Sequence, residues 1–150
     1  MHPLPHQYRV SASLTSDETV SVAGEGLSPL STTTPPQFGG PPGQWSPETL
    51  LVGAVADCFA LTFRGIARRV NAVWTSMHCQ VIGTLDRKDG VTQFTNFAFD
   101  VTVTVPRDVD EKPIREVAVK AERGCLITNS MKATVDLNTR ITVSEQPAAA

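Results

Sequence analysis

The sequence predicts an α+β domain in which a long apolar helix packs on a mostly antiparallel sheet. Three observations favour this class: several segments alternate apolar and polar residues, one long apolar segment begins with helix-capping residues, and a later segment has an amphipathic helical stripe. The chain has 150 residues, which suits one core, so a single domain over residues 1–150 is expected. Residues 1–6 and 145–150 are expected to be flexible tails.

Two strands and a long loop are expected before the first helix. Residues 8–14 alternate apolar and polar side chains, which predicts a strand with one buried face. Residues 15–18 are expected to turn into a second strand over residues 19–23. Between Gly24 and Ser46 the chain is rich in Gly, Pro, Ser and Thr, and its prolines exclude a helix interior or a central strand. A loop of this length in a compact domain is typically functional.

The first helix is predicted to begin after Ser46 and to run to about Val70. Ser46 is a favourable N-cap, Pro47 suits the first helical position and Glu48 suits the first turn. The first half of the helix is apolar on nearly all sides, which predicts that it is buried on most sides. Because a sheet covers only one side of a helix, we expect a partner chain to cover the other side. The apolar residues are Leu50, Leu51, Val52, Ala54, Val55, Phe59, Leu61 and Phe63.

A long hairpin, a second helix and a last strand follow. Residues 73–85 and 93–105 each alternate, and the Asp89-Gly90 pair between them favours a tight turn. Asp110 is expected to cap the second helix, which Gly124 ends. The apolar stripe of this helix is Ile114, Val117, Ala118 and Ala121. Residues 133–143 alternate again and predict the last strand.

Charge and composition exclude several classes of partner. Thirteen basic and fifteen acidic residues leave a net charge of −2 without a basic block, which argues against nucleic acid or an anionic membrane as the partner. The N-terminal residues lack the apolar region of a signal peptide, and no segment is expected to reach the ~20 apolar residues of a membrane span. We therefore expect a cytoplasmic protein, in which paired cysteines favour redox or metal chemistry over structural disulfides.

The three cysteines have different expected roles. Cys79 alternates with Met77 and Val81 on an apolar strand face, which is typical of a core residue. Cys125 directly follows Gly124 and opens a new helical turn, where free N–H groups favour a thiolate; a reactive thiol and an inert buried thiol both remain open. Cys58 lies in the apolar helix, and the second cysteine and the preceding loop favour a reactive role for it over simple packing.

Two segments resemble motifs of the OsmC/Ohr family. The segment "FGGPPGQWSPETLLVGAVADCF" resembles the family's Pro-Glu at a helix start followed by Cys-Phe, and "AVKAERGCLITNSM" is similar to its second cysteine motif. The resemblance implies an OsmC-like fold and an intertwined homodimer with active sites at the subunit interface. It also implies thiol peroxidase chemistry on organic hydroperoxides, without a metal or an organic cofactor.

The resemblance assigns roles to the two motif cysteines. Cys58 corresponds to the peroxidatic cysteine, whose thiolate attacks the O–O bond and becomes a sulfenic acid. Cys125 corresponds to the resolving cysteine, which condenses with that sulfenic acid to a disulfide. A dithiol then reduces the disulfide, and the family's lipoyl-type reductants are one candidate.

One position departs from the family pattern. In the family, an arginine of the preceding loop, held by the Pro-Glu glutamate, supplies positive charge to the thiol. Here Gln37 stands at that place and leaves Glu48 without this partner, although both residues are still expected to support the site. Two outcomes remain open. Either an arginine reaches the site from elsewhere, or Cys58 is weakly activated and the chain belongs to an OsmC-like branch with little peroxidase activity. The candidates are Arg9 and the partner subunit's Arg64 or Arg68.

Other chemistries fit the sequence less well. His2, His6 and His78 lack the spacing of a metal site in an ordered element. His78 is also the one histidine in an expected element that could serve a cysteine hydrolase, but it falls on the polar face of its strand. The remaining competitor to the peroxidase is a binding protein of the same fold with inert thiols and a small apolar ligand at the dimer interface.

Overall fold

The computed structural model describes residues 2–16 and 19–144. The expected tail over residues 145–150 and the second half of the expected turn at residues 15–18 therefore lie outside the described residues. The chain forms two compact units, which divide between Leu51 and Val52. Each unit is described by itself below, and the expectation of a single domain stays a prediction. Residues 2–6 are exposed and belong to no helix or strand.

The first unit contains a three-stranded antiparallel sheet in the order β1-β2-β3. Its elements are β1 (Val10–Ser13), β2 (Val20–Gly24), β3 (Leu30–Thr32) and a 3-10 helix, η1 (Pro36–Phe38). The strand β3 lies within the segment for which we expected only a loop. Pro29 precedes this strand and Pro35 follows it, and the strand itself contains no proline. The rule that proline is excluded from strands therefore does not prevent these residues from pairing.

The buried face predicted for the first strand is wrong for this chain. All four residues of β1 are exposed, and Tyr8 and Val10 retain 88% and 67% of their accessible surface. The alternation of residues 8–14 identifies an apolar face correctly, but alternation does not say what covers that face.

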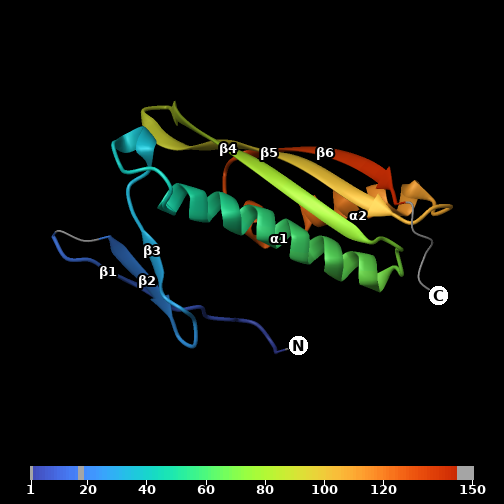
Figure 1. The fold of residues 1–150 in the computed structure, drawn as a ribbon, viewed down its shortest axis with the longest axis horizontal. Helices are drawn as coiled ribbons and strands as arrows, with labels where there is room; N and C mark the ends of the chain where they lie inside the picture. Colours follow the sequence, from blue (N-terminus) through green and yellow to red (C-terminus); the bar gives the residue numbers. More distant parts are fainter. Residues whose placement is uncertain (1, 17–18, 145–150) are drawn as a thin grey trace. The chain divides into compact units, whose positions relative to one another are not determined.

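The second unit contains most of α1 (Pro47–Arg69) and a sheet in the order β4-β5-β6. Its further elements are β4 (Ser76–Lys88), β5 (Val91–Val105), α2 (Glu111–Arg123), α3 (Leu126–Asn129) and β6 (Thr134–Val143). The expected hairpin is confirmed, because β4 and β5 pair antiparallel and Asp89 and Gly90 both have positive φ. β6 runs parallel to β5 because the chain crosses over through α2 and α3 (Figure 1). With the other three strand pairs antiparallel, the expected α+β class is confirmed.

The core of the second unit lies between this sheet and the helices. Five alternate residues of β5 are at most 2% exposed, and these residues are Phe97, Phe99, Val101, Val103 and Val105. The ring of Phe59 in α1 packs against Phe99 with a centroid distance of 5.3 Å. The predicted stripe of α2 is also buried, as expected from its spacing.

Within this chain α1 is buried along one side, and its expected cover on the other side by a partner chain stays a prediction. Its buried residues form one stripe, Val55, Phe59, Phe63 and Ala67, whereas Leu61 is 49% exposed. The helix corrects one expectation, because by length and composition alone α1 could cross a membrane. Its buried stripe nevertheless packs on the sheet, as in the core helix of a folded domain.

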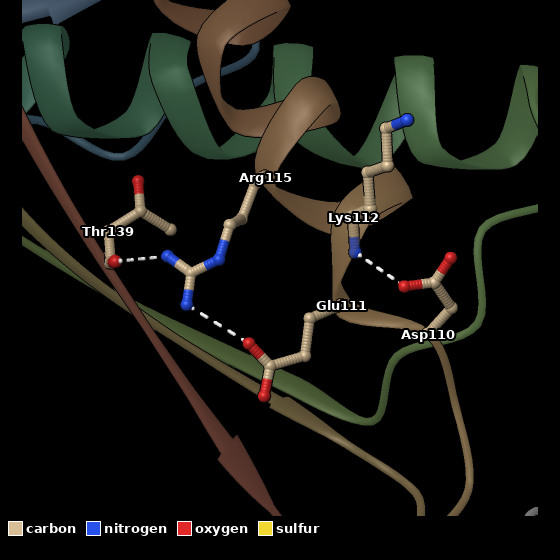
Figure 2. Close-up of polar contacts among 5 residues, drawn as sticks. All are labelled: Asp110, Glu111, Lys112, Arg115 and Thr139. Carbon is tan, nitrogen blue, oxygen red and sulfur yellow. Dashed lines mark hydrogen bonds and ion pairs between the residues drawn. The ribbon is translucent and has the colours of Figure 1, made fainter.

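Polar contacts fix the position of α2 on the sheet (Figure 2). Asp110 caps this helix as expected, because its side chain accepts a hydrogen bond of 3.0 Å from the Lys112 N–H. Arg115 donates to the Glu111 carboxylate at 3.0 Å and to the Thr139 carbonyl of β6 at 3.1 Å. α2 is thus attached to the parallel strand, and its C-terminal end carries Cys125.

Candidate thiol site

Cys58 and Cys125 lie together in the second unit. Cys58 is partly buried in α1, whereas Cys125 is fully buried as the residue that precedes α3. Gly124 packs so closely on α1 that a Cβ at this position would lie 3.3 Å from Cγ2 of Thr62. Thr62 follows Cys58 by one helical turn and therefore shares its face of α1. The two thiols form a hydrogen bond, and neither is in a disulfide.

The surroundings of Cys125 favour the protonated form of its thiol. Burial raises the pKa of the Cys125 thiol, and polar groups of Thr128 oppose this effect. The hydrogen bond to Cys58 and a negative charge on Cys58 raise the pKa of Cys125 further. Cys125 is therefore the thiol that keeps its proton when Cys58 is charged.

The expectation that a helix start favours a thiolate at Cys125 is wrong. The helix α3 has only four residues, and Cys125 makes no side-chain capping bond to it. Its dipole is therefore small, and burial raises the pKa of the Cys125 thiol.

Cys79 lies on the inner face of β4, directly opposite Val101 of β5. Cys79 is partly buried, as its expected core position predicts. Burial raises its pKa to about 11, and the charge of Cys125 contributes in the same direction. The alternation of residues 77–81 placed Cys79 on this face correctly, but it carried no signal of the electrostatic effect of Cys125.

The first unit has a cavity of about 250 Å³ at the start of α1. It is lined by Val20, Thr32, Thr33, Thr34, Pro35, Phe38, Pro47 and Glu48. The Oε2 atom of Glu48 is buried and has no hydrogen-bond partner among the residues that the structure describes. Sequence reasoning missed the three threonines, and their only signal was the run of hydroxyl residues before two prolines.

Two local features shape this cavity. Ser46 caps α1 as predicted: its Oγ accepts from the Thr49 N–H at 3.2 Å, and its own N–H donates to Thr49 Oγ1 at 2.8 Å. Gly40 lies against the cavity wall, because a Cβ there would fall 1.7 Å from the carbonyl oxygen of Thr34. A glycine is therefore required at this point of the loop.

The other predicted supporting residues are exposed. Gln37 lies on η1 and does not line the cavity of Glu48. Arg9 precedes the β1 residue that pairs with Gly24, whereas the cavity lies at Val20, at the other end of β2, about 13 Å away by strand rise. Arg9 of the same chain is thus not the missing partner of Glu48. The support of Cys58 by Gln37 and Glu48 stays a prediction.

Metal chemistry gains no support from the side-chain geometry. Within residues 2–16 and 19–144, no group of three or more His, Cys, Asp and Glu side chains is placed to hold a metal ion. His6 instead makes a hydrogen bond of 3.0 Å with the carbonyl of His2, and both residues are exposed.

The class of this protein is defined by its α+β fold, in which a long helix lies along a three-stranded sheet, and by a pair of free thiols of which one is buried and the other partly buried. Residues 40–140 match the family model described as OsmC-like protein, and the chain belongs to this family. The uncharacterized protein YmaD of Bacillus subtilis is 22% identical over 112 residues, which cover 73% of this chain and 75% of YmaD.

Solved structures share the fold. An OsmC-like protein of unknown function from Vibrio cholerae superposes with a TM-score of 0.78 at 18% identity, covering 92% of this chain and all of that one. The organic hydroperoxide resistance protein OsmC of Legionella pneumophila has a TM-score of 0.69 at 20% identity, with 93% of this chain and 99% of that chain covered.

Proposed function

We propose that this protein is a thiol-dependent peroxidase that reduces organic hydroperoxides. The observation that carries the proposal is the hydrogen-bonded pair of free thiols, Cys58 and Cys125. Membership of the OsmC-like family supports it, as does the fold shared with an organic hydroperoxide resistance protein. We place this activity in the cytoplasm, where a dithiol reductant keeps the site reduced.

Cys58 is the proposed nucleophile and Cys125 the proposed resolving thiol. The Cys58 thiolate attacks one peroxide oxygen, the O–O bond breaks, and the alkoxide leaves and takes up a proton to become an alcohol. Cys58 is then a sulfenic acid. The Cys125 sulfur attacks the Cys58 sulfur, and the proton of Cys125 leaves with the hydroxyl group as water. A dithiol, with a lipoyl-type compound as the first candidate, reduces the resulting disulfide by two exchange steps.

The direction of this assignment follows from the surroundings of the two sulfurs. Cys58 is the more accessible thiol, and Cys125 is fully buried behind it and keeps its proton. A nucleophile has to meet the substrate, whereas a resolving thiol has to meet only the sulfenic acid. The pair is therefore suited to attack by Cys58 and to disulfide closure by Cys125.

A second copy of the chain is proposed to complete the protein as a homodimer. Apolar side chains are exposed on β1 and on the outer side of α1, including Tyr8, Val10 and Leu61. Exposed apolar surface of this kind favours association. The partner subunit's Arg64 or Arg68 is the proposed source of the positive charge that Gln37 lacks.

Turnover of an organic hydroperoxide with dihydrolipoamide as the reductant tests this function. The wild-type chain should consume the hydroperoxide, and Cys58→Ser should reduce consumption to the uncatalysed rate. Cys125→Ser should allow a single oxidation of Cys58 to a sulfenic acid and no disulfide. Equal, uncatalysed rates for the wild type and Cys58→Ser would contradict the proposal.

The exposed, uncharged Gln37 favours a second candidate, a ligand-binding protein of the same fold with weakly activated thiols. The variant Gln37→Arg separates the two candidates, because a guanidinium stabilises a thiolate more strongly than an amide does. A binding protein should show little turnover as the wild type and a clear gain in Gln37→Arg. An active wild type that gains little from this change supports the peroxidase.

A further inference from the structure

The side of α1 that faces away from the sheet carries an outer stripe of three exposed residues, Asp57, Leu61 and Arg64. The stripe is negative at one end, positive at the other and apolar between them, and Leu61 retains 49% of its accessible surface. Asp57 and Arg64 are seven residues apart, about 20° short of two full helical turns, so both side chains leave the same side of α1. The buried stripe through Phe59 and Phe63 lies on the opposite side.

The two charges of the outer stripe have no partner in the part of the chain that the structure describes. Within residues 2–16 and 19–144, Asp57 and Arg64 make no hydrogen bond or ion pair. Residues that pair along one helix are three or four apart, whereas these two are seven apart, about 10.5 Å along the axis. Each charge is therefore available to an opposite charge from outside this chain.

The order of the charges makes the outer stripe complementary to its own copy. In a twofold dimer two identical surfaces face each other, and antiparallel helices place the beginning of one stripe opposite the end of the other. The twofold axis then passes between Ala60 and Leu61. In this arrangement Asp57 of each chain faces the partner subunit's Arg64. The exposed apolar surface of Leu61 lies at the helix crossing, where contact with a second copy removes it from water.

We propose that Asp57 of each chain pairs with the partner subunit's Arg64, in two symmetric ion pairs that set the register of the two α1 helices. This inference rests on the homodimer of the proposed function and names the charges that orient it. The pair brings the partner subunit's Arg64 to the residue directly before Cys58. It thereby supplies the positive charge that the proposed peroxidase needs near this thiol.

The other exposed arginine of this side, Arg68, is disfavoured as the partner of Asp57 by like charges. If Asp57 faced the partner subunit's Arg68, the axis would pass between residues 62 and 63. The two copies of Arg64 would then lie only about 4.5 Å apart along the helices. With Asp57 opposite the partner subunit's Arg64, the two copies of Arg64 are about 10.5 Å apart, and Arg68 faces the partner subunit's Gly53. The proposed register therefore separates like charges, whose juxtaposition is costly.

Charge reversal tests the pair, because single and combined variants have different expected results. Asp57→Arg and Arg64→Asp each replace two attractive pairs by two repulsive ones and should weaken the homodimer about tenfold or more. An equimolar mixture of these two variants should form a heterodimer, because opposite charges again face each other at both positions. The double variant Asp57→Arg/Arg64→Asp should dimerise like the wild type. Native mass spectrometry identifies the heterodimer, since the two variants differ in mass.

Two controls separate the pair from a general effect of surface charge. Arg68→Asp changes an exposed arginine one turn further along α1 that faces no carboxylate, and it should change the dissociation constant by no more than about twofold. Added salt should weaken the wild-type dimer and strengthen the homodimers of the single variants, because it screens attraction and repulsion alike. Sedimentation over a dilution series measures these constants, and circular dichroism checks that each variant is folded.

Three outcomes would overturn the inference. The first is wild-type affinity in both Asp57→Arg and Arg64→Asp. The second is a loss of affinity in Arg68→Asp but not in Arg64→Asp, which would assign Asp57 to the other arginine. The third is a wild-type chain that stays monomeric at every concentration, which would leave the outer stripe to a different partner.

These outcomes are independent of turnover. If the charge reversals have no effect but the wild type consumes hydroperoxide, the inference fails and the proposed peroxidase stands. If the mixture of single variants restores the dimer but no variant and no wild-type chain consumes hydroperoxide, the ion pair stands and the proposed peroxidase fails.

Discussion

The two sheets of this chain have the same number of strands but differ in how they are covered. Both have three strands, yet β5 of the second sheet buries five alternate residues from Phe97 to Val105 within its own unit, whereas all of β1 is exposed. The second sheet is covered by α1 and α2, and the same unit contains all three thiols. The first sheet presents an apolar face that the described chain leaves open, which is the expected property of a surface reserved for a second copy.

This difference predicts that the substitution of a valine by aspartate has different effects in the two sheets: it should destabilise the fold in β5 and weaken association in β1. Val101→Asp would place a charge in a fully buried position of β5 and should cost more than about 4 kcal/mol of the free energy of unfolding. Val10→Asp on β1 should leave the chain folded but weaken the proposed dimer. Circular dichroism melts and light scattering over a dilution series measure the two effects. Equal unfolding of both variants, or a Val10→Asp dimer of undiminished affinity, would remove the distinction.

The second unit should also be sensitive to added volume where its elements approach closely. A Cβ at Gly83 of β4 would lie 2.7 Å from Val52 and 2.8 Å from Phe94, so Gly83→Ala should destabilise the protein by about 1–3 kcal/mol. The matched variant Gly65→Ala, in α1, meets nothing within 4 Å and should stabilise it by about 0.5–1 kcal/mol. Denaturant unfolding measures both, and the same sign for both would contradict this packing.

Substitutions at the start of α1 should change the free energy of unfolding less than those in the core, because they affect only a helix cap. Ser46→Ala removes the hydrogen bond to the Thr49 N–H and should cost about 1 kcal/mol. Ser46→Asp retains an acceptor and should recover most of that loss. Urea unfolding of the three chains tests this order, and an Ala variant as stable as the wild type would show that the cap is dispensable.

Local patterns predicted the elements that depend on neighbouring residues. The hairpin follows from alternation and Asp89-Gly90, and α2 follows from Asp110 and its apolar stripe. The strand β3, the parallel pairing of β6 and the open face of β1 depend on partners distant in the sequence, which a local pattern does not identify. For the same reason the motifs marked Cys58 and Cys125, whereas nothing in the local pattern indicated the cavity at Glu48.

The proposed function requires a disulfide between Cys58 in α1 and Cys125 at the start of α3. The most direct measurement is the mass of the intact, reduced protein after one equivalent of an organic hydroperoxide at neutral pH, followed by tryptic mapping. The account predicts the loss of two hydrogen atoms and a link between tryptic peptide 10–64, which contains Cys58, and tryptic peptide 124–132, which contains Cys125. Unchanged thiols after complete mixing would contradict the proposal that these two thiols reduce hydroperoxides.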